Sequence, residues 1–277
     1  MSEREAVDRT VSPVTPAAIR DGLEQLGLPL GATVLVHASL SALGWVAGGA
    51  HAVVLALVDT VGPSGTLVMP TQSSNLSDPA HWSNPPVPEG WWELIRRETP
   101  AFDPSLTPTR HMGAIVECFR HLPGVRRSDH PTRSFAAAGP AADGIVGSHE
   151  PTHGFGERSP LARLYDADAW VLLLGVGHAN NTSLHLAEYR ANYPGKAWTQ
   201  QGSPLMIDGR HQWIEYSELV DDYSDFEALG EAFAQTGSEL QARIGAGTVR
   251  LMRQRALVDF AVQWFEDHRQ PTPSRDS

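Results

Sequence analysis

The chain has 277 residues and a formal net charge of −11, from 32 acidic and 21 basic side chains. This length allows one large α/β domain or two small ones, and we expect a single domain with a full hydrophobic core. The acidic balance argues against a nucleic-acid partner, and it suits either a cationic ligand or solubility alone. The apolar runs are too short to cross a bilayer, and the first residues do not resemble a signal peptide. We therefore expect a cytoplasmic protein with no membrane partner.

Strands and helices alternate in the first half of the sequence. Residues 1–14 are expected to be disordered, and a helix is predicted over 15–28. A buried strand ending at His37 follows, and then come a helix over 50–62 and a second buried strand over 65–71. This order predicts an α/β fold with a central, mostly parallel or mixed sheet that is flanked by helices.

Residues 72–108 lose this regular pattern. They contain closely spaced prolines and tryptophans, and they form either a wall or lid of a binding site or a structural insertion over a sheet edge. A helix is then predicted over about 110–121, followed by a short strand near Phe135.

The last third of the sequence predicts a β-hairpin insertion near 203–216, since Asp208-Gly209 separates two alternating β segments. Two closing helices are predicted over 226–235 and 249–268. The domain is therefore expected to span 15–268, with a disordered tail over 269–277.

The most informative segment is 171–190, where an apolar strand leads through a glycine-containing turn into a helix. His185 and Glu188 lie three positions apart in that helix and therefore share a face. A histidine oriented by a carboxylate is a candidate general base. Metal binding and a plain structural role are the alternatives for this pair.

Other chemistries have weaker support. The His–Glu pair supplies two metal ligands at most, and we expect no metal. The GVGHAN turn lacks the third glycine of a dinucleotide motif, and no GxSxG elbow is present. The single cysteine, Cys118, has apolar neighbours and is more consistent with a core position than with a nucleophile. A structural role is an equal alternative for His37, His130 and His178.

Six segments occur in an order that resembles the aminoglycoside 3-N-acetyltransferase family over about residues 15–260. They are LVHASLSALGWVAGGA (35–50), GPSGTLVMPT (62–71), FDPSLTPTRHMG (102–113), RRSDHPTRSFAAAG (126–139), GERSPLARLY (156–165) and LLLGVGHANNTSLHLAE (172–188).

The resemblance implies acetyl transfer from acetyl-CoA to the 3-amino group of a 2-deoxystreptamine aminoglycoside, by a monomer or homodimer. His185 matches the family's general base, Glu188 the acid of the same helix, and Thr182 the residue near the thioester carbonyl. The residues that match the coenzyme-binding stretches, or a conserved element beside them, are His37, Ser39, Leu40, Ser41, Thr107, Thr109, Met112, Gly113, His130, Ser134 and Phe135.

This chemistry suits the residues independently of the family. A neutral imidazole can accept the proton of an attacking amine, and the Thr182 hydroxyl or a helix N–H can donate to the oxyanion. With no free nucleophile evident, direct transfer in a ternary complex is expected.

A cationic acceptor needs carboxylates near its other ammonium groups, because a carboxylate beside the reacting amine would raise that amine's pKa. The candidate acceptor-binding residues are Asp78, His178, Asp221, Asp222 and Asp225. Each acid is alternatively a solvated surface residue. The alternative functions are acetylation of another amine in antibiotic biosynthesis and non-catalytic binding of a cation.

Overall fold

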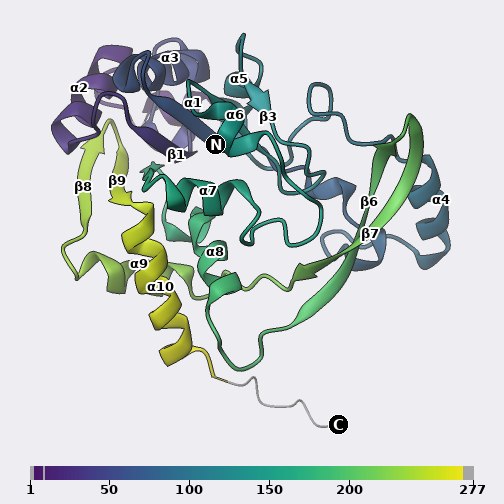
Figure 1. Cartoon of the computed structure of the whole chain (residues 1–277). Helices are drawn as coiled ribbons and strands as arrows, with labels where there is room; N and C mark the ends of the chain where they lie inside the picture. The colour runs from purple at the N-terminus through teal and green to yellow at the C-terminus, as the bar shows by residue number, and fades with distance from the viewer. Residues whose placement is uncertain (1–2, 9, 271–277) are drawn as a thin grey trace.

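A seven-stranded mixed sheet lies at the centre of the computed structural model, which describes residues 3–8 and 10–270 (Figure 1). Its strands are β1 (Thr33–Ala38), β2 (Thr66–Pro70), β3 (Arg126–Arg127), β4 (Phe135–Ala138), β5 (Trp170–Leu174), β8 (Glu239–Ile244) and β9 (Gly247–Arg253). Their spatial order is β3-β4-β2-β1-β5-β9-β8. The central strand β1 pairs in parallel with β2 and β5, and the outer pairings are antiparallel. The predicted α/β fold with a mixed sheet is confirmed.

Helices cover both faces of this sheet, and one further helix, α4, lies away from it. The helices of the described residues are α1 (Glu3–Asp8), α2 (Pro16–Leu26), α3 (Gly49–Val61), α4 (Trp92–Glu98), α5 (Gly113–Arg120), α6 (Ala142–Val146), α7 (Pro160–Asp166), α8 (Ser183–Arg190), α9 (Phe226–Ala234) and α10 (Gln254–His268). Side chains alternate along β1, so that Val34 and Val36 join one core with α2, α3 and α5. Leu35 joins the second core, with α6 to α10. Among the described helices, none is both long and apolar enough to cross a membrane.

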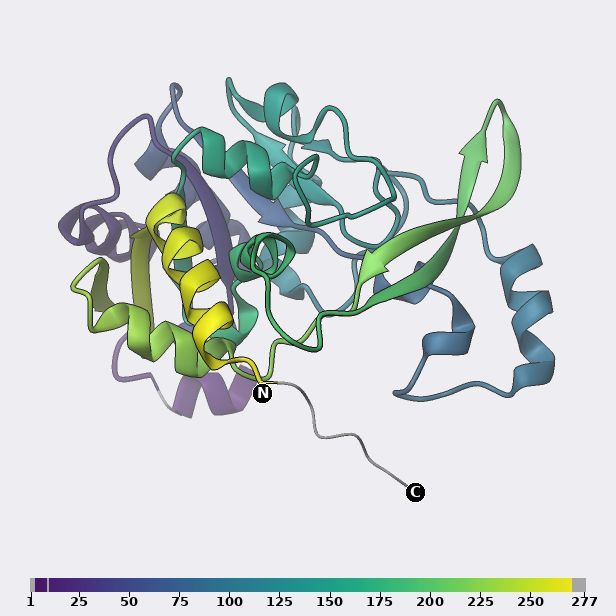
Figure 2. The same ribbon diagram turned by 60° about the horizontal axis from the view of Figure 1, so that its bottom comes forward.

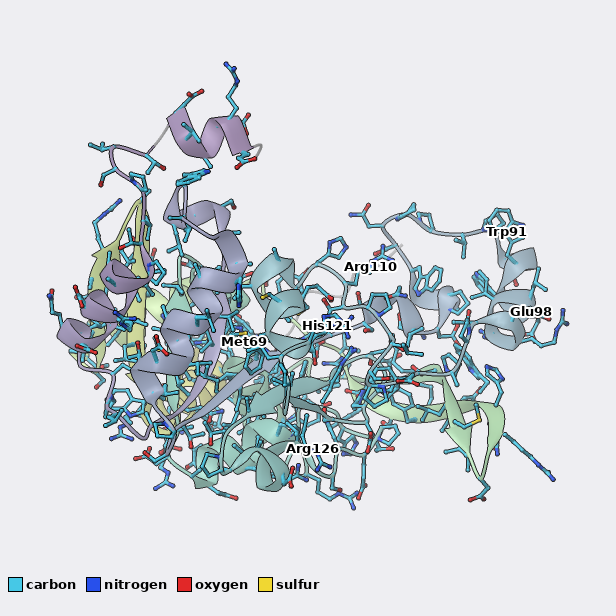
Figure 3. The ribbon with its side chains drawn as sticks, turned by 90° about the horizontal axis from the view of Figure 1, so that it is seen from above. Met69, Trp91, Glu98, Arg110, His121 and Arg126 are labelled. Carbon is cyan, nitrogen blue, oxygen red and sulfur yellow. The ribbon has the colours of Figure 1, made fainter. Side chains whose placement is uncertain are left out.

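A separate two-stranded sheet projects from this body together with α4 (Figure 2). Strands β6 (Trp198–Ile207) and β7 (Arg210–Leu219) pair along their whole length around the turn at Asp208 and Gly209. The predicted hairpin is confirmed and is longer than expected. Seen from above, Trp91 and Glu98 lie at the far end of the molecule from Met69 of β2 (Figure 3). The irregular segment 72–108 therefore forms much of a lobe beside the sheet.

The prediction of a helix over 249–268 is wrong for residues 249–253. Residues Gly247–Arg253 form β9, which pairs antiparallel with β5, and the unpredicted β8 pairs with β9 in turn. Val249 and Leu251 face one core at strand spacing, and Leu257 and Val258 of α10 continue the apolar pattern into the other core. Apolar spacing across this junction does not separate a strand from the helix that follows it.

The predicted disorder of residues 1–14 is also wrong for the described part of that segment. Helix α1 lies there, Trp45 Nε1 donates to Glu3 at 3.3 Å, and Val14 pairs with Val46. The expected disordered tail begins too early, because Arg269 is only 8% exposed. Residues 1, 2, 9 and 271–277 lie outside the described residues.

Candidate active site

His185 projects from α8, which begins just beyond the carboxyl end of β5 and the short helical turn His178–Asn180. The Asn181 side chain accepts from the Ser183 N–H at 3.2 Å and so helps to start the helix. His185 Nδ1 lies 2.6 Å from Glu188 Oε2, with the Glu188 side chain fully buried and that of His185 13% exposed. Because the carboxylate accepts from Nδ1, the opposite nitrogen, Nε2, is left to exchange a proton.

Aromatic rings hold the imidazole on both sides. Phe155 stacks on His185 with ring centroids 4.8 Å apart and an interplanar angle of 6°, and Phe226 lies 5.0 Å away at 58°. Phe155 is buried in the core formed by α6 to α10. These contacts fix the ring orientation, which the His–Glu spacing alone does not determine.

Arg269, which directly follows α10, holds the second oxygen of Glu188. Its Nη1 donates to Glu188 Oε1 at 2.7 Å, and two of its nitrogens donate to Asp225 at 2.8 Å. Burial alone would lower the pKa of Arg269, but the hydrogen bonds to Asp225 and Glu188 raise it. Sequence reasoning missed this residue, since a polar residue after a closing helix carries no local signal.

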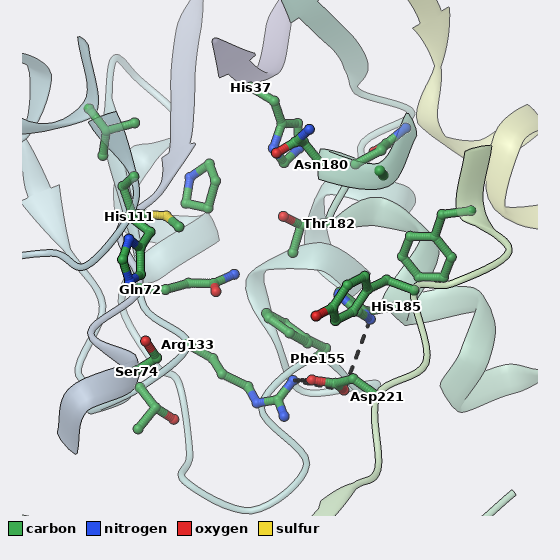
Figure 4. Close-up of a pocket in the computed structure, with 18 of the residues that line it drawn as sticks. His37, Gln72, Ser74, His111, Arg133, Phe155, Asn180, Thr182, His185 and Asp221 are labelled. Carbon is green, nitrogen blue, oxygen red and sulfur yellow. Dashed lines mark hydrogen bonds and ion pairs between the residues drawn. The ribbon is translucent and has the colours of Figure 1, made fainter. Parts of the chain in front are cut away.

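A second ion-pair network, which includes Asp221 and Arg133, lies close to the same nitrogen of His185 (Figure 4). Asp221 Oδ1 is 4.0 Å from His185 Nδ1, and Asp221 Oδ2 is 2.9 Å from Arg133 Nη1. Arg133 Nε also lies 3.3 Å from Glu218, and the Tyr189 hydroxyl donates to Glu218 at 2.7 Å. Burial opposes the charge of Glu218, yet Arg133 keeps the pKa of Glu218 below its ordinary value.

Two carboxylates and the His185 imidazole form the one cluster of possible metal ligands among the described residues. His185, Glu188 and Asp221 offer atoms within 4.8 Å of one another. However, Glu188 is already paired with Arg269, and Asp221 is paired with Arg133. The arginines neutralise the carboxylates that a cation would need, so the metal-free site stays our prediction.

Two adjoining pockets meet beside α8. One, which we call the base pocket after the candidate base His185, has a volume of about 450 Å³ and is lined by His185, Thr182, Asp221 and residues of the irregular segment such as Gln72. The turn pocket, about 890 Å³, is lined by the turn after β1 and the start of α5. Five residues line both pockets and mark where they meet: Ala38, His111, Met112, Val176 and Asn180.

The predicted coenzyme residues divide into pocket-lining and supporting positions. Those that line the turn pocket are Ser39, Leu40, Ser41, Met112 and Gly113. Those that line neither pocket are Thr107, Thr109, His130, Ser134 and Phe135.

The supporting positions are held by internal contacts. His130, Ser134 and Phe135 are fully buried. His130 Nδ1 accepts from the Arg133 N–H at 3.1 Å, and the Thr109 N–H donates to Glu117 at 2.9 Å. These residues therefore brace the walls of the site.

His37 occupies the base pocket instead of the turn pocket. It is 5% exposed, and burial, followed by the nearby His185 and His178, lowers its pKa to about 3. The imidazole of His37 is therefore neutral at physiological pH.

Only one of the predicted acceptor acids, Asp221, lines the base pocket. Asp78 instead pairs with Arg96 at 2.9 Å. Its partner lies 18 residues further along the chain, and a charge count over the sequence does not reveal the pairing.

The remaining acceptor candidates are also engaged elsewhere. Asp222 accepts from the Ser224 hydroxyl at 2.6 Å, and Asp225 pairs with Arg269. His178 is 2% exposed, and its Nε2 lies 2.7 Å from Glu239, so it lines neither pocket.

A His–Glu pair beside two adjoining pockets suits an enzyme that binds two substrates. The chain belongs to the aminoglycoside 3-N-acetyltransferase family, whose sequence model matches residues 35–266, and the members of this family are acyltransferases.

Individual relatives match nearly the whole chain. An aminoglycoside N(3')-acetyltransferase-like protein of Bacillus subtilis, YokD, is 45% identical over 95% of this chain and 96% of its own. The crystal structure of YokD superposes with a TM-score of 0.93, at 43% identity over 99% of this chain and 100% of its own.

Two further relatives carry named activities or ligands. Aminoglycoside N(3)-acetyltransferase VIII of Streptomyces fradiae is 36% identical over 96% of each chain. The structure of AAC-IIIb in a binary complex with CoASH has a TM-score of 0.83, at 32% identity over 95% of this chain and 100% of its own.

Proposed function

We propose that this protein transfers the acetyl group of acetyl-CoA directly to an amine, with His185 as the general base. The observation that carries this proposal is the 2.6 Å contact between His185 Nδ1 and buried Glu188 beside the junction of two pockets. The family supplies the first acceptor to test, the 3-amino group of a 2-deoxystreptamine aminoglycoside, and antibiotic resistance as the biological outcome.

The turn pocket is our candidate for the coenzyme site. Ser39 and Ser41 offer hydroxyls there, with their oxygens 3.3 Å apart, and several glycines permit close approach to the backbone. The binary complex of AAC-IIIb with CoASH supports coenzyme A as a ligand of this fold. Acetyl-CoA would supply the activated thioester, and this chain supplies the base and the donors around it.

The transfer step follows from the positions of the side chains. The amine nitrogen forms a bond to the thioester carbonyl carbon, and its proton moves to His185 Nε2. Glu188 stabilises the resulting imidazolium, and the Thr182 hydroxyl, which lines the same pocket, donates to the oxyanion. When the C–S bond breaks, the thiolate takes the proton back from His185.

A covalent acetyl-enzyme is not needed in this scheme. The single cysteine, Cys118, is part-buried and packs against the core formed by α2, α3 and α5. Direct transfer requires both substrates at once, and the residues shared by the two pockets are consistent with that requirement.

The decisive test replaces His185 with alanine. We expect His185→Ala to lower kcat by about 10³-fold, within the range of general-base catalysis, while calorimetry still detects coenzyme A binding. Free-thiol release from acetyl-CoA with a panel of 2-deoxystreptamine antibiotics measures turnover, and NMR of the product gives the acetylated position.

The matched control is His51→Ala, which removes an exposed histidine of α3 outside both pockets. It should behave as the wild type does. Near-normal turnover by His185→Ala would remove His185 from the base role, and absence of thiol release by the wild type with every amine would reject the proposed function.

A further inference from the structure

A buried histidine–glutamate pair other than His185 and Glu188 contacts the turn that joins β5 to α8. His178 Nε2 lies 2.7 Å from Glu239 Oε2, and the two side chains are only 2% and 1% exposed. Neither residue lines the base pocket or the turn pocket. The transfer step described above makes no use of this pair.

The turn itself, residues 175–182, forms part of the wall of both pockets. Val176 and Asn180 line both of them, and Thr182 lines the base pocket, where Figure 4 shows it near His185. The turn is held from outside the pockets, since Arg250 Nη1 of β9 donates to the Val176 carbonyl at 3.1 Å. Residues that line neither pocket therefore set the position of groups that do.

The hydrogen bonds around His178 fix its tautomer. A carboxylate only accepts, and Glu239 Oε1 already accepts from Gln241 at 2.7 Å, so the proton between Glu239 Oε2 and the imidazole lies on His178 Nε2. His178 Nδ1 then has a lone pair, which accepts from Asn181 Nδ2 at 3.4 Å. This contact turns the Asn181 oxygen towards the Ser183 N–H, which donates to it at 3.2 Å.

The opposite tautomer would disturb the start of α8. A proton on His178 Nδ1 would face the N–H groups of the Asn181 amide, and the amide would have to turn over. The Ser183 N–H would then lose its acceptor, although it is one of the first N–H groups of the helix and has no partner within it. The tautomer of His178 therefore determines how the helix that carries His185 begins.

The space for the imidazole is provided by a glycine. Gly230 lies inside α9, where alanine is normally the better helix former. A Cβ at Gly230 would lie 2.2 Å from both Cγ and Cδ2 of His178, so any larger residue would displace the ring. The close approach of α9 thus keeps the imidazole between Glu239 and Asn181.

From these contacts, and resting on the proposed function, we infer that His178 and Glu239 are positioning residues for acetyl transfer. Glu239 fixes the tautomer of His178, and the Nδ1 lone pair of that tautomer holds Asn181 in the orientation that caps α8. Thr182 and His185 are thereby kept in place beside the reacting carbonyl. A displacement of about 1 Å at such groups can lower the rate by on the order of 10²-fold.

The first experiment separates the two nitrogens of His178. His178→Asn places an amide oxygen where Nδ1 was and keeps an acceptor for Asn181, whereas His178→Gln reaches Glu239 and loses that acceptor. We expect kcat to fall about tenfold in His178→Gln, the factor for one hydrogen bond, and to stay within about threefold in His178→Asn. The KM for acetyl-CoA should change less than about twofold in both.

Thermal unfolding should rank the same two variants in the opposite order. His178→Asn leaves the buried Glu239 without its imidazole donor, so it should unfold at a lower temperature than His178→Gln. A purely structural role predicts instead that the loss of kcat follows the loss of stability.

The second experiment determines the tautomer without turnover. Nitrogen NMR of histidine-labelled wild type, with the ring assigned through its contact with Gly230, should show His178 protonated on Nε2 alone. Glu239→Gln should give a mixture of tautomers, because an amide donates as well as accepts. Glu231→Gln, at an exposed position of α9 outside both pockets, is the control and should keep the wild-type tautomer.

The outcomes distinguish this inference from the proposed function. If His178→Asn loses kcat as fully as His178→Gln, or if kcat follows stability in the two variants, the positioning role is wrong and the acetyltransferase function stands. A wild-type His178 protonated on Nδ1 also overturns it, even where neither His178 variant folds. If the wild type releases no thiol from acetyl-CoA with any amine, the proposed function fails, and the positioning role fails with it even if NMR finds the expected tautomer.

Discussion

The two pockets that meet at Asn180 have walls of different construction. Around the base pocket, side chains from distant parts of the chain contact one another: His185 contacts Glu188, and Glu188 accepts a hydrogen bond from Arg269. Around the turn pocket, many of the lining residues are small, and several of them follow β1 and β5. We therefore expect substitutions on the base side to change kcat, and those on the turn side to change the KM of the coenzyme.

The largest effect after loss of His185 is expected at Arg269. Arg269→Gln leaves Glu188 buried without its cation, which should lower kcat by roughly 10²-fold at neutral pH. It should also move the acidic limb of the kcat/KM profile to higher pH by about 1 unit, because loss of a nearby positive charge favours the imidazolium.

The acidic limb is the informative measurement, since it reports the electrostatic coupling directly. The other charged or titratable groups around His185 are Asp221, with its partner Arg133, and His37. Arg190→Gln removes an arginine–carboxylate pair of the same helix that does not contact Glu188, and it should leave the profile unchanged. An unshifted profile in Arg269→Gln would limit Arg269 to a structural role.

The turn side should respond at Gly175, which has a φ of 75°. A Cβ there would lie 2.9 Å from the Ala42 side chain and 3.2 Å from the Ser39 carbonyl, so Gly175→Ala displaces the turn. We expect the KM for acetyl-CoA to rise about tenfold with little change in kcat, which is roughly 1.4 kcal/mol of binding.

Gly209→Ala provides the matched control for that experiment. Gly209 has a similar φ of 73° at the hairpin tip, but no heavy atom lies within 4 Å of its added Cβ. Steady-state kinetics of both variants, with thermal unfolding measured in parallel, separates backbone strain from displacement of the turn. A fall in kcat in Gly175→Ala at unchanged KM would contradict the assignment of this wall to the coenzyme.

The smallest effect concerns His37, which lies in the base pocket next to Ala38, a residue shared by the two pockets. Its folded pKa of about 3 is below the ordinary value of 6.5, mainly because of burial. The unfolded chain takes up the proton first, so the stability contribution is complete above pH 6.5 and is lost as the pH falls towards 3.

At pH 5.5 this loss amounts to about 1 kcal/mol. Urea unfolding between pH 7 and 5.5 should therefore show a flatter pH dependence in His37→Gln than in the wild type. The exposed His51→Gln serves as the control. Equal slopes in His37→Gln and the wild type would show that His37 is not held neutral by the fold.

Local parts of this architecture could be predicted from the sequence. The parallel strands around β1 have continuous apolar runs, which predict buried strands. The contact between His185 and Glu188 could be predicted because residues three positions apart share a helix face. The partners that complete the site depend on tertiary contacts, since Arg269 lies 81 residues from Glu188 and Arg133 lies 88 residues from Asp221. For the same reason Asp78 was predicted as an acceptor residue, although Arg96 neutralises it.

Both ends of the described chain contribute to the site. Helix α1 supplies Glu3 and Ala6 to the turn pocket, and Arg269 reaches Glu188 from beyond the last helix. Protein engineering should respect this arrangement: an affinity tag fused before Glu3 would start beside the lining of the turn pocket, and trimming the chain at His268 would delete the contact between Arg269 and Glu188. A cleavable N-terminal tag and an intact Arg269 are therefore the conditions under which kinetic constants report the native enzyme.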